Sequence, residues 1–335
     1  MTGKLDLMHK ALDGCTQLLI IPHNDPDPDA IAAAVGLQYL LNEIFGIQIY
    51  IKYWGNIGRA ENKALVKYLN HPLKKFKHQD IYQDIPIALV DTQPGTGNNP
   101  LLKGLTASIV IDHHALKDAS SNAKYVDVRP EIGASATILT EYLRTAGLEI
   151  PATLATALFY GIKTDTMGLG RNASQSDKAA YLYLQPQVDV DALVQIERAQ
   201  VPLTYFKSLD GAIHTARVYD NDLVISYIGK MKYPDLGAEI ADLLMRLKGV
   251  NLVLCMGTNK SDLILSVRSR SQQIRAGKLV QHIIGDLGTA GGHGTMAGGQ
   301  IRLSSTDPEL LVDQLSKEVL QYIKGDDSLV GKPFI

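Results

Sequence analysis

The chain has 335 residues, of which 45% are hydrophobic and 20% are charged, so its length allows two globular domains with separate cores. Its formal net charge is −2 at pH 7 and it lacks runs of Lys and Arg, which excludes a protein that coats long nucleic acid through many contacts to phosphate. No apolar stretch approaches the ~20 residues that a membrane-spanning helix needs.

Up to about residue 185, apolar runs of strand length alternate with segments of helical periodicity. The expected strands are 18–22, 47–52, 85–90 and 108–111, and the expected helices are 29–45, 59–70, 134–146 and 152–160, with a further helix at 191–198 in the segment that follows the domain. This order predicts an α/β domain over residues 1–185, with a parallel sheet and helices on both faces. Gln185-Pro186-Gln187 interrupts the pattern, and we expect residues 186–203 to form a linker.

The remaining residues, 204–335, predict a second, smaller α/β domain. It begins with a helix, followed by strands at 223–228, 251–256 and 263–267 and a helix at 272–287. The next twelve residues, 288–299, contain six glycines and precede a final strand. A loop with so few side chains lets backbone N–H groups approach an anion closely, although a plain turn has the same composition.

Acidic and imidazole side chains recur in four segments of the first domain. In chain order they are His23, Asp27, Asp29, Asp91, Asp112, His113, His114 and Asp165. We expect each segment to lie at the end of a strand. Parallel strands that end at one edge of a sheet gather such side chains in a single crevice.

The types of these side chains indicate a metal site. Carboxylate oxygens bind Mn²⁺ and Mg²⁺, and imidazole is tolerated best by Mn²⁺ and heavier transition metals. The set contains no thiolate, so we expect two divalent cations, Mn²⁺ first, with Mg²⁺ or Co²⁺ as alternatives. The ionised carboxylates of Asp27, Asp29, Asp91 and Asp165 would balance the charge of two such cations. Two cations roughly 3.5–4 Å apart share a hydroxide and direct it at phosphorus, which predicts hydrolysis of a phosphate ester.

Each of these residues also has a structural interpretation. An aspartate after a strand is often a turn or helix cap, so neither Asp91 nor Asp165 is decisive alone, and Asp112 is open to a purely structural role. The pair His113-His114 is harder to explain in this way, because two buried imidazoles without partners are costly. The joint occurrence of the four segments is what supports a functional site.

The motifs resemble those of the DHH phosphoesterase superfamily, which is named for the triplet seen here as Asp112-His113-His114. The segment His23–Ala30 matches its first motif, His-x-x-Pro-Asp-x-Asp-Ala, and Gly161–Thr166 matches the fourth, Gly-Ile-x-Thr-Asp-Thr. Arg268-Ser269 and Gly291-Gly292-His293 resemble the motifs of the DHH-associated C-terminal domain. The departures are Thr289-Ala290, where a longer glycine run is common, and Asp25 and Pro28 within the first motif.

The resemblance implies a role for each residue. One metal would be held by His23, Asp27 and Asp91, and the other by Asp29, Asp91, His113 and Asp165, with Asp91 bridging the two. His114 would face the substrate and Asp112 would orient the histidine pair. The residues implied to bind substrate are Arg268, Ser269, Gly291, Gly292 and His293.

Within the superfamily, size and layout are most similar to the nanoRNases, which degrade very short oligonucleotides and dephosphorylate 3′-phosphoadenosine 5′-phosphate. We therefore expect an enzyme that hydrolyses short nucleotides in a cleft between its two domains. Family II inorganic pyrophosphatases share the first-domain motifs, but Gly291-Gly292-His293 argues against them. Two alternatives remain: a cyclic or linear dinucleotide phosphodiesterase, and a nucleotide-binding protein without catalysis.

The remaining features concern the cellular setting. Cys15 and Cys255 lack the paired spacing of a metal site, and Cys255 lies in an apolar run typical of a buried thiol. The N-terminus has no apolar core of a signal peptide. We expect a cytoplasmic protein whose ligands are short nucleotides rather than long nucleic acid or membrane, and the sequence leaves a homodimer open.

Overall fold

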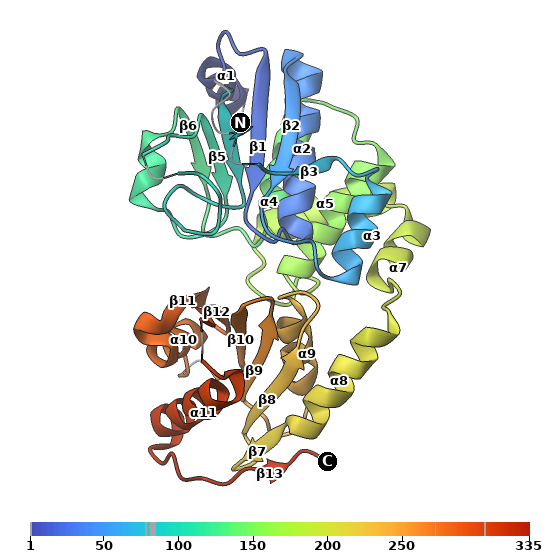
Figure 1. The fold of residues 1–335 in the computed structure, drawn as a ribbon. Helices are drawn as coiled ribbons and strands as arrows, with labels where there is room; N and C mark the ends of the chain where they lie inside the picture. The colour runs from blue at the N-terminus through green and yellow to red at the C-terminus, as the bar shows by residue number, and fades with distance from the viewer. Residues whose placement is uncertain (1, 78, 81–84, 103, 272, 305) are drawn as a thin grey trace. The chain divides into compact units, whose positions relative to one another are not determined.

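The computed structural model describes residues 2–77, 79–80, 85–102, 104–271, 273–304 and 306–335. The chain forms two compact units, Met1–Ala199 and Gln200–Ile335 (Figure 1). The expected linker, 186–203, includes helix α7 (Val190–Glu197), which packs against α3 (Ala60–Tyr68). Because Leu193 and Ile196 are buried in the core of the first unit, this stretch of the linker is part of that unit in the structure.

The first unit is built on a six-stranded sheet. Its strands are β1 (Gln17–Pro22), β2 (Gln48–Tyr53), β3 (Leu73–Lys75), β4 (Ile87–Val90), β5 (Ile109–Asp112) and β6 (Tyr125–Val128), in the spatial order β3-β2-β1-β4-β5-β6. All neighbouring strands are parallel, which confirms the predicted fold class. The order reverses between β1 and β4, and ligands of such sheets bind at this switch point, beyond the carboxyl ends of the strands.

The helices of the first unit contribute to one large core. Besides α3 and α7 they are α1 (Thr2–Ala11), α2 (Pro28–Phe45), α4 (Ser135–Thr145), α5 (Ala152–Asp165) and α6 (Gln175–Leu184). This core includes Leu18 and Ile20 of β1, whereas Leu19 and Ile21 point to the opposite face of the sheet. Among the described residues, the cluster on that second face is completed by residues of connecting segments, such as Phe76 and Ala107. Within the described residues, connecting segments cover the second face of the sheet, whereas the sequence predicts helices on both faces.

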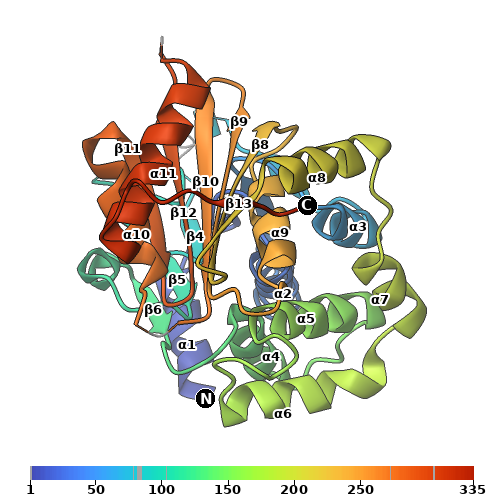
Figure 2. The same ribbon diagram turned by 90° about the horizontal axis from the view of Figure 1, so that it is seen from below.

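The second unit contains a seven-stranded mixed sheet. Its strands are β7 (Arg217–Tyr219), β8 (Leu223–Lys230), β9 (Leu252–Asn259), β10 (Asp262–Ser269), β11 (Gly288–His293), β12 (Met296–Arg302) and β13 (Lys332–Pro333), in the order β11-β12-β10-β9-β8-β7-β13. Strands β8 and β9 are parallel, and the other neighbours are antiparallel. Helices α8 (Leu203–Thr215) and α9 (Leu236–Leu244) cover one face, and α10 (Ala276–Ile284) and α11 (Pro308–Lys324) cover the other (Figure 2).

The glycine-rich segment differs from the loop that the sequence predicts. Residues 288–302 form the antiparallel hairpin of β11 and β12. A Cβ atom on Gly299 would lie 2.1 Å from Ile284 Cδ1, and one on Gly292, where φ is +133°, would lie 2.4 Å from Ala297 Cα. Gly292 requires glycine because of its positive φ and its contact with the backbone of the paired strand, and Gly299 lets β12 pack closely against α10, reasons that composition alone does not reveal.

In the part of the chain that the structure describes, no helix is both long and apolar enough to cross a membrane.

Candidate metal centre

Three strand ends supply residues to the switch point of the first sheet. His23 directly follows β1, Asp91 directly follows β4, and Asp112 is the last residue of β5. β1 pairs with β4 and β4 pairs with β5, so the three strands end side by side. The runs before these residues are buried on both faces, as the sequence predicts for central parallel strands.

Two further aspartates lie at helix N-termini. Asp27 is the N-cap of α2, where its side chain accepts a hydrogen bond from Ala30 N at 3.0 Å. Asp29 is fully buried in the first turn of the same helix and accepts hydrogen bonds from Ser135 N at 2.6 Å and Ala136 N at 2.8 Å, at the start of α4. Both carboxylates therefore have a structural role in addition to any role in binding a cation.

Asp165 lies at the end of a helix, not of a strand as expected. The predicted helix 152–160 continues to Asp165 as α5. Gly161 allows this helix to approach α2 closely, since a Cβ atom there would lie 3.1 Å from Asp29 Cα. A carboxylate at a helix C-terminus is destabilised by the partial negative charge of that end, and a bound cation would offset this repulsion.

The side chains form two donor groups that share Asp91. In the first, His23 Nε2 lies 3.6 Å from Asp27 Oδ1 and 3.5 Å from Asp91 Oδ2. In the second, His113 Nε2 lies 3.3 Å from Asp91 Oδ1 and 3.4 Å from Asp165 Oδ2. Around this imidazole, Asp29 groups with His113 and Asp165, and Asp91 groups with His113 and His114. The two oxygens of Asp91 thus face different imidazoles.

The backbone at Asp91 is held in an unusual conformation. Its φ is +58°, in the left-handed region, and its amide donates to Ile111 O at 2.9 Å. Its Oδ1 accepts a hydrogen bond from Ser135 Oγ at 2.9 Å, and the residue is 2% exposed. Strained residues that are fixed on several sides occur preferentially at functional sites.

The crowding of charge perturbs the ionisable groups. Burial raises the pKa of Asp165 to about 8, with the charges of Asp27 and Asp91 acting in the same direction. Burial and the neighbouring carboxylates likewise hold the pKa of Asp29 well above its ordinary range. Although burial alone would lower the pKa of His23, its contacts with Asp27 and Asp91 raise it to about 10. The field that stabilises positive charge on the imidazole is the field that attracts a cation.

The histidines present the atoms that a cation requires. His23 Nδ1 lies 2.7 Å from Asn24 O and His113 Nδ1 lies 3.2 Å from Ile132 O. A carbonyl oxygen only accepts, so in the neutral rings Nδ1 carries the proton and Nε2 offers its lone pair to the donor group. Within the described residues, the buried His113 Nε2 has no hydrogen-bond partner. The residues therefore fit divalent cations.

His114 groups with Asp91 and His113, and Asp112 lies beside it. His114 Nδ1 is 2.8 Å from Asp112 Oδ1, and the rings of His113 and His114 have centroids 4.4 Å apart. Asp112 Oδ1 also accepts from His113 N at 2.8 Å. Asp112 is 1% exposed. Its buried carboxylate contacts the backbone of His113 and the ring of His114, and therefore orients both histidines.

Two buried polar residues of the site were missed in the sequence. Gln93 Nε2 donates to Asp112 Oδ2 at 2.6 Å, and its Oε1 accepts from Lys117 N and Ser120 Oγ, each at 2.8 Å. Ser135 connects Asp29 to Asp91 through its amide and its hydroxyl. Gln93 fixes the triplet and the loop after it, and Ser135 fixes the two most buried carboxylates.

The residues expected to bind substrate lie in the second unit. Arg268 is paired with Asp242 of α9, and Ser269 Oγ accepts from Ser271 N at 3.1 Å. Gly291 and Gly292 are exposed residues of β11. Arg268 and His293 both pair with Met296 of β12, so their backbones lie in one row across three strands. The side chain of His293 lies outside the described residues.

Comparison with known protein families identifies both halves of the chain. Residues 17–162 match the DHH family, N-terminal domain, and residues 220–325 match the DHHA1 domain. An uncharacterized protein of Methanocaldococcus jannaschii is 36% identical over 286 residues, which cover 85% of this chain and 58% of that protein. A probable manganese-dependent inorganic pyrophosphatase of Streptococcus pyogenes is 23% identical over 153 residues, 45% of this chain and 49% of that protein. The chain thus spans about half the length of these relatives.

A solved structure has the same fold over nearly the whole chain. The crystal structure of an exopolyphosphatase-related protein from Bacteroides fragilis superposes with a TM-score of 0.75 and covers 96% of this chain and 97% of its own. The identity is 15%, so the likeness concerns the fold.

Proposed function

Because the chain belongs to the DHH phosphoesterase superfamily, we propose that it is a Mn²⁺-dependent phosphoesterase that hydrolyses short oligonucleotides or 3′-phosphoadenosine 5′-phosphate. The observation that carries this proposal is Asp91, whose two carboxylate oxygens face separate donor groups. Four carboxylates and three imidazoles, counting that of His114, form a donor set typical of hard or borderline divalent cations.

In this proposal one cation is held by His23, Asp27 and Asp91, and the other by Asp29, Asp91, His113 and Asp165. Bound divalent cations would activate a water molecule and stabilise the negative charge that develops on the leaving oxygen. Ser135 and the start of α4 keep Asp29 and Asp91 in position, since their hydrogen bonds fix the rotamers of both side chains.

His114 is proposed to contact the substrate phosphate. Its Nδ1 faces Asp112, so the ring is oriented with Nε2 on its opposite side. The carboxylates of Asp91 and Asp112, together with their contacts to the ring, raise the pKa of His114 although burial opposes them. A protonated imidazole in this place would bind a phosphate oxygen or protonate the leaving group.

The second unit is proposed to supply contacts to substrate through Arg268, Ser269, Gly291, Gly292 and His293. Arg268 is the cation of this set, and a guanidinium binds phosphate through paired N–H donors. Arg268 Nε donates a hydrogen bond to Asp242, and a phosphate would compete with this carboxylate for the guanidinium.

The test is a substrate panel with Mn²⁺. It compares a linear dinucleotide, 3′-phosphoadenosine 5′-phosphate, a cyclic dinucleotide and pyrophosphate, each with and without a chelator. We expect the highest kcat/KM for the first two substrates and no turnover with the chelator. Preference for the cyclic dinucleotide would favour the alternative phosphodiesterase. Absence of turnover on every member would contradict the proposal and favour a protein that binds nucleotides without hydrolysing them.

A further inference from the structure

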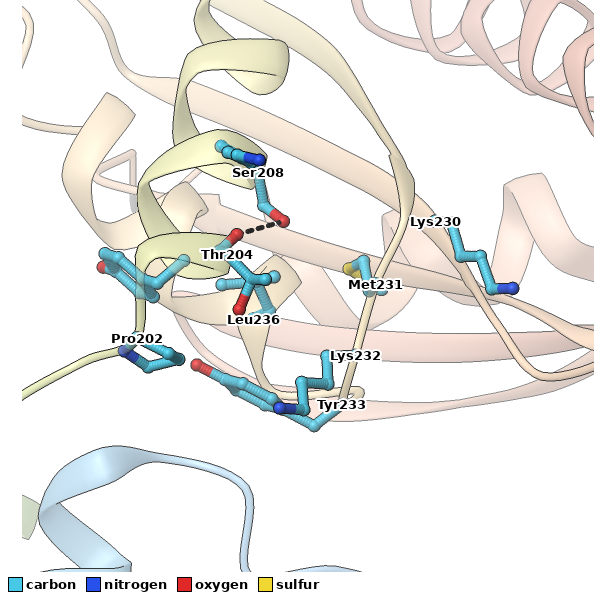
Figure 3. A pocket seen from close by; sticks show the side chains of 10 residues that line it. Pro202, Thr204, Ser208, Lys230, Met231, Lys232, Tyr233 and Leu236 are labelled. Carbon is cyan, nitrogen blue, oxygen red and sulfur yellow. Dashed lines mark hydrogen bonds between the residues drawn. The ribbon is translucent and has the colours of Figure 1, made fainter.

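A cavity of about 380 Å³ lies in the second unit, where the start of α8 faces the segment between β8 and α9. Figure 3 shows Thr204 and Ser208 of α8 on one wall and Met231, Lys232 and Tyr233 on the other. This volume is within the range of small-molecule sites. None of the residues proposed above to bind metal or substrate lines this cavity.

The cavity is cationic. Three of the residues that line it are lysines, Lys207, Lys230 and Lys232, and none is acidic. Among the described residues, none of the three ammonium groups forms an ion pair or hydrogen bond, whereas Lys4, Lys52, Lys163 and Lys324 are all paired with carboxylates. Lys230 extends away from the other labelled side chains, whereas Lys232 lies beside Tyr233 (Figure 3). Lys207 lines the cavity from α8. Unpaired lysines around a concave surface favour an anionic ligand.

The walls between these charges are apolar and aromatic. Tyr205 and Tyr233 line the cavity together with Met231 and Leu236. Both tyrosines pack against the hydrophobic core of this face of the sheet, so their rings are held in place before any ligand binds. Rings fixed in this way offer surfaces on which a planar heterocycle stacks. The cavity therefore combines sites for an aromatic ring and for a phosphate.

We propose that this cavity binds a nucleotide, with the base against Tyr205 and Tyr233 and the phosphate near Lys207 and Lys232. The inference goes beyond the proposed function, because it requires neither metal nor hydrolysis. The bound nucleotide can come from two sources. It is either part of an oligonucleotide substrate or a free nucleotide that regulates the enzyme.

The test is to measure the equilibrium binding of adenosine 5′-monophosphate to the full chain by titration calorimetry, with a chelator present. We expect saturable binding, tighter than that of adenosine or inorganic phosphate alone. The double variant Lys207→Ala/Lys232→Ala should raise Kd by about tenfold or more. Tyr233→Ala should weaken binding to a similar degree, whereas Tyr233→Phe, which keeps the ring, should bind like the wild type.

The control is Lys248→Ala, which removes an exposed lysine of the same unit that does not line the cavity. It should leave Kd unchanged, as should Asp91→Asn in the metal centre. The proposal is overturned if the wild type shows no saturable binding at millimolar nucleotide, or if the double variant binds as tightly as Lys248→Ala.

Kinetics with Mn²⁺ distinguish the two sources. If the cavity holds part of the substrate, the double variant raises KM for a dinucleotide but not for pyrophosphate. If it holds a regulatory nucleotide, added adenosine 5′-monophosphate changes kcat in the wild type and not in the double variant. A wild type that hydrolyses no substrate but binds the nucleotide in this cavity would contradict the proposed function and support the present inference.

Discussion

At the scale of single residues, Asp27 and Asp29 each combine two roles that are usually separate. Asp27 caps α2 while its Oδ1 lies 3.6 Å from His23 Nε2, and Asp29 caps the start of α4 while it joins the second donor group. A helix cap requires a hydrogen-bond acceptor, whereas a cation requires negative charge. A substitution that keeps the acceptor and removes the charge therefore separates the two roles.

Asp27→Asn is this substitution. Asparagine caps helices as well as aspartate does, so we expect the free energy of unfolding of the metal-free protein to change by less than about 0.5 kcal/mol. Affinity for Mn²⁺ should fall by about tenfold or more, because one charged ligand is lost. Asp307→Asn is a matched control, since Asp307 also caps a helix before a proline, at the start of α11. Equal Mn²⁺ affinities of the two variants would contradict the assignment of Asp27 as a ligand.

Arg268 provides a test of the substrate residues. Arg268→Ala should lower kcat/KM on the best substrate by about tenfold or more, as expected for the loss of a charge-assisted contact to phosphate. Arg302→Ala is a suitable control, because Arg302 pairs with Asp262 at the opposite end of β10. An unchanged kcat/KM for Arg268→Ala on every active substrate would remove this residue from the site.

The sequence predicts the candidate metal ligands better than it predicts the residues that hold those ligands in position. His23, Asp27, Asp91, His113 and Asp165 lie in short motifs whose residue types are those of metal ligands. Gln93 and Ser135 have no such signal, because their partners Asp112 and Asp29 are 19 and 106 positions away in the chain. Only the fold brings these pairs together.

At the scale of elements, the sheet places the centre through its strand order. β1, β4 and β5 are adjacent although they are separated along the chain, and all three end at the same edge. The alternation of strands and helices predicts this class of sheet. The alternation does not predict that Asp165 is the last residue of a helix, since Gly161-Ile162 resembles the end of a strand as well as a helix interior.

Two elements that the sequence pattern did not predict, α1 and β6, are joined by an ion pair between Lys4 and Asp127. Helix α11 has clear signals in the sequence, Asp307-Pro308 at its start and Gly325 after its end, although it was not among the predicted helices. Boundaries supported by caps could thus have been predicted, whereas elements held by distant charges could not.

The polar cluster around Asp127 predicts how the first unit responds to acid. Asp127 accepts from Lys4 Nζ, from Arg129 and from the Tyr142 hydroxyl. Although burial opposes it, these contacts lower the pKa of Asp127 below its ordinary value of 3.8. A lowered folded-state pKa stabilises the protein above the ordinary pKa, and this contribution is lost as the pH falls through the folded-state value.

Asp127→Asn should therefore lower the free energy of unfolding at pH 7 by about 2 kcal/mol, because charge-assisted hydrogen bonds are lost. The difference from the wild type should shrink as the pH falls from about 5 to about 2. Urea unfolding at a series of pH values measures it, with the exposed Asp13→Asn as control. A difference that stays constant with pH would show that the Asp127 charge does not stabilise the fold.

At the scale of the whole molecule, charge and size restrict the substrate. A chain with a net charge of −2 lacks the many cationic contacts that hold a long phosphate backbone. Affinity would instead come from a few local contacts, at the metal centre, at Arg268 and at the nucleotide cavity of the second unit.

A small number of local contacts predicts a preference for short substrates. The value of kcat/KM should fall from oligonucleotides of two and five residues to those of twelve and twenty-four. Binding should weaken only mildly with salt, with a shallow slope of log K against log salt concentration. Measurement at two salt concentrations checks both expectations. A twenty-four-residue strand degraded as efficiently as a dinucleotide would indicate a processive exonuclease instead.

The most direct test of the account is the number of Mn²⁺ ions that each chain binds. The variant to compare is Asp91→Asn, because asparagine tolerates the φ of +58° that would strain alanine and keeps an acceptor for Ser135. The control is Asp25→Asn, since Asp25 accepts from Asn56 N outside both donor groups. Calorimetric titration should give two ions per chain for the wild type and the control, and fewer than two for Asp91→Asn. Two ions bound by Asp91→Asn with wild-type affinity, or none bound by the wild type, would contradict a two-cation centre bridged by Asp91.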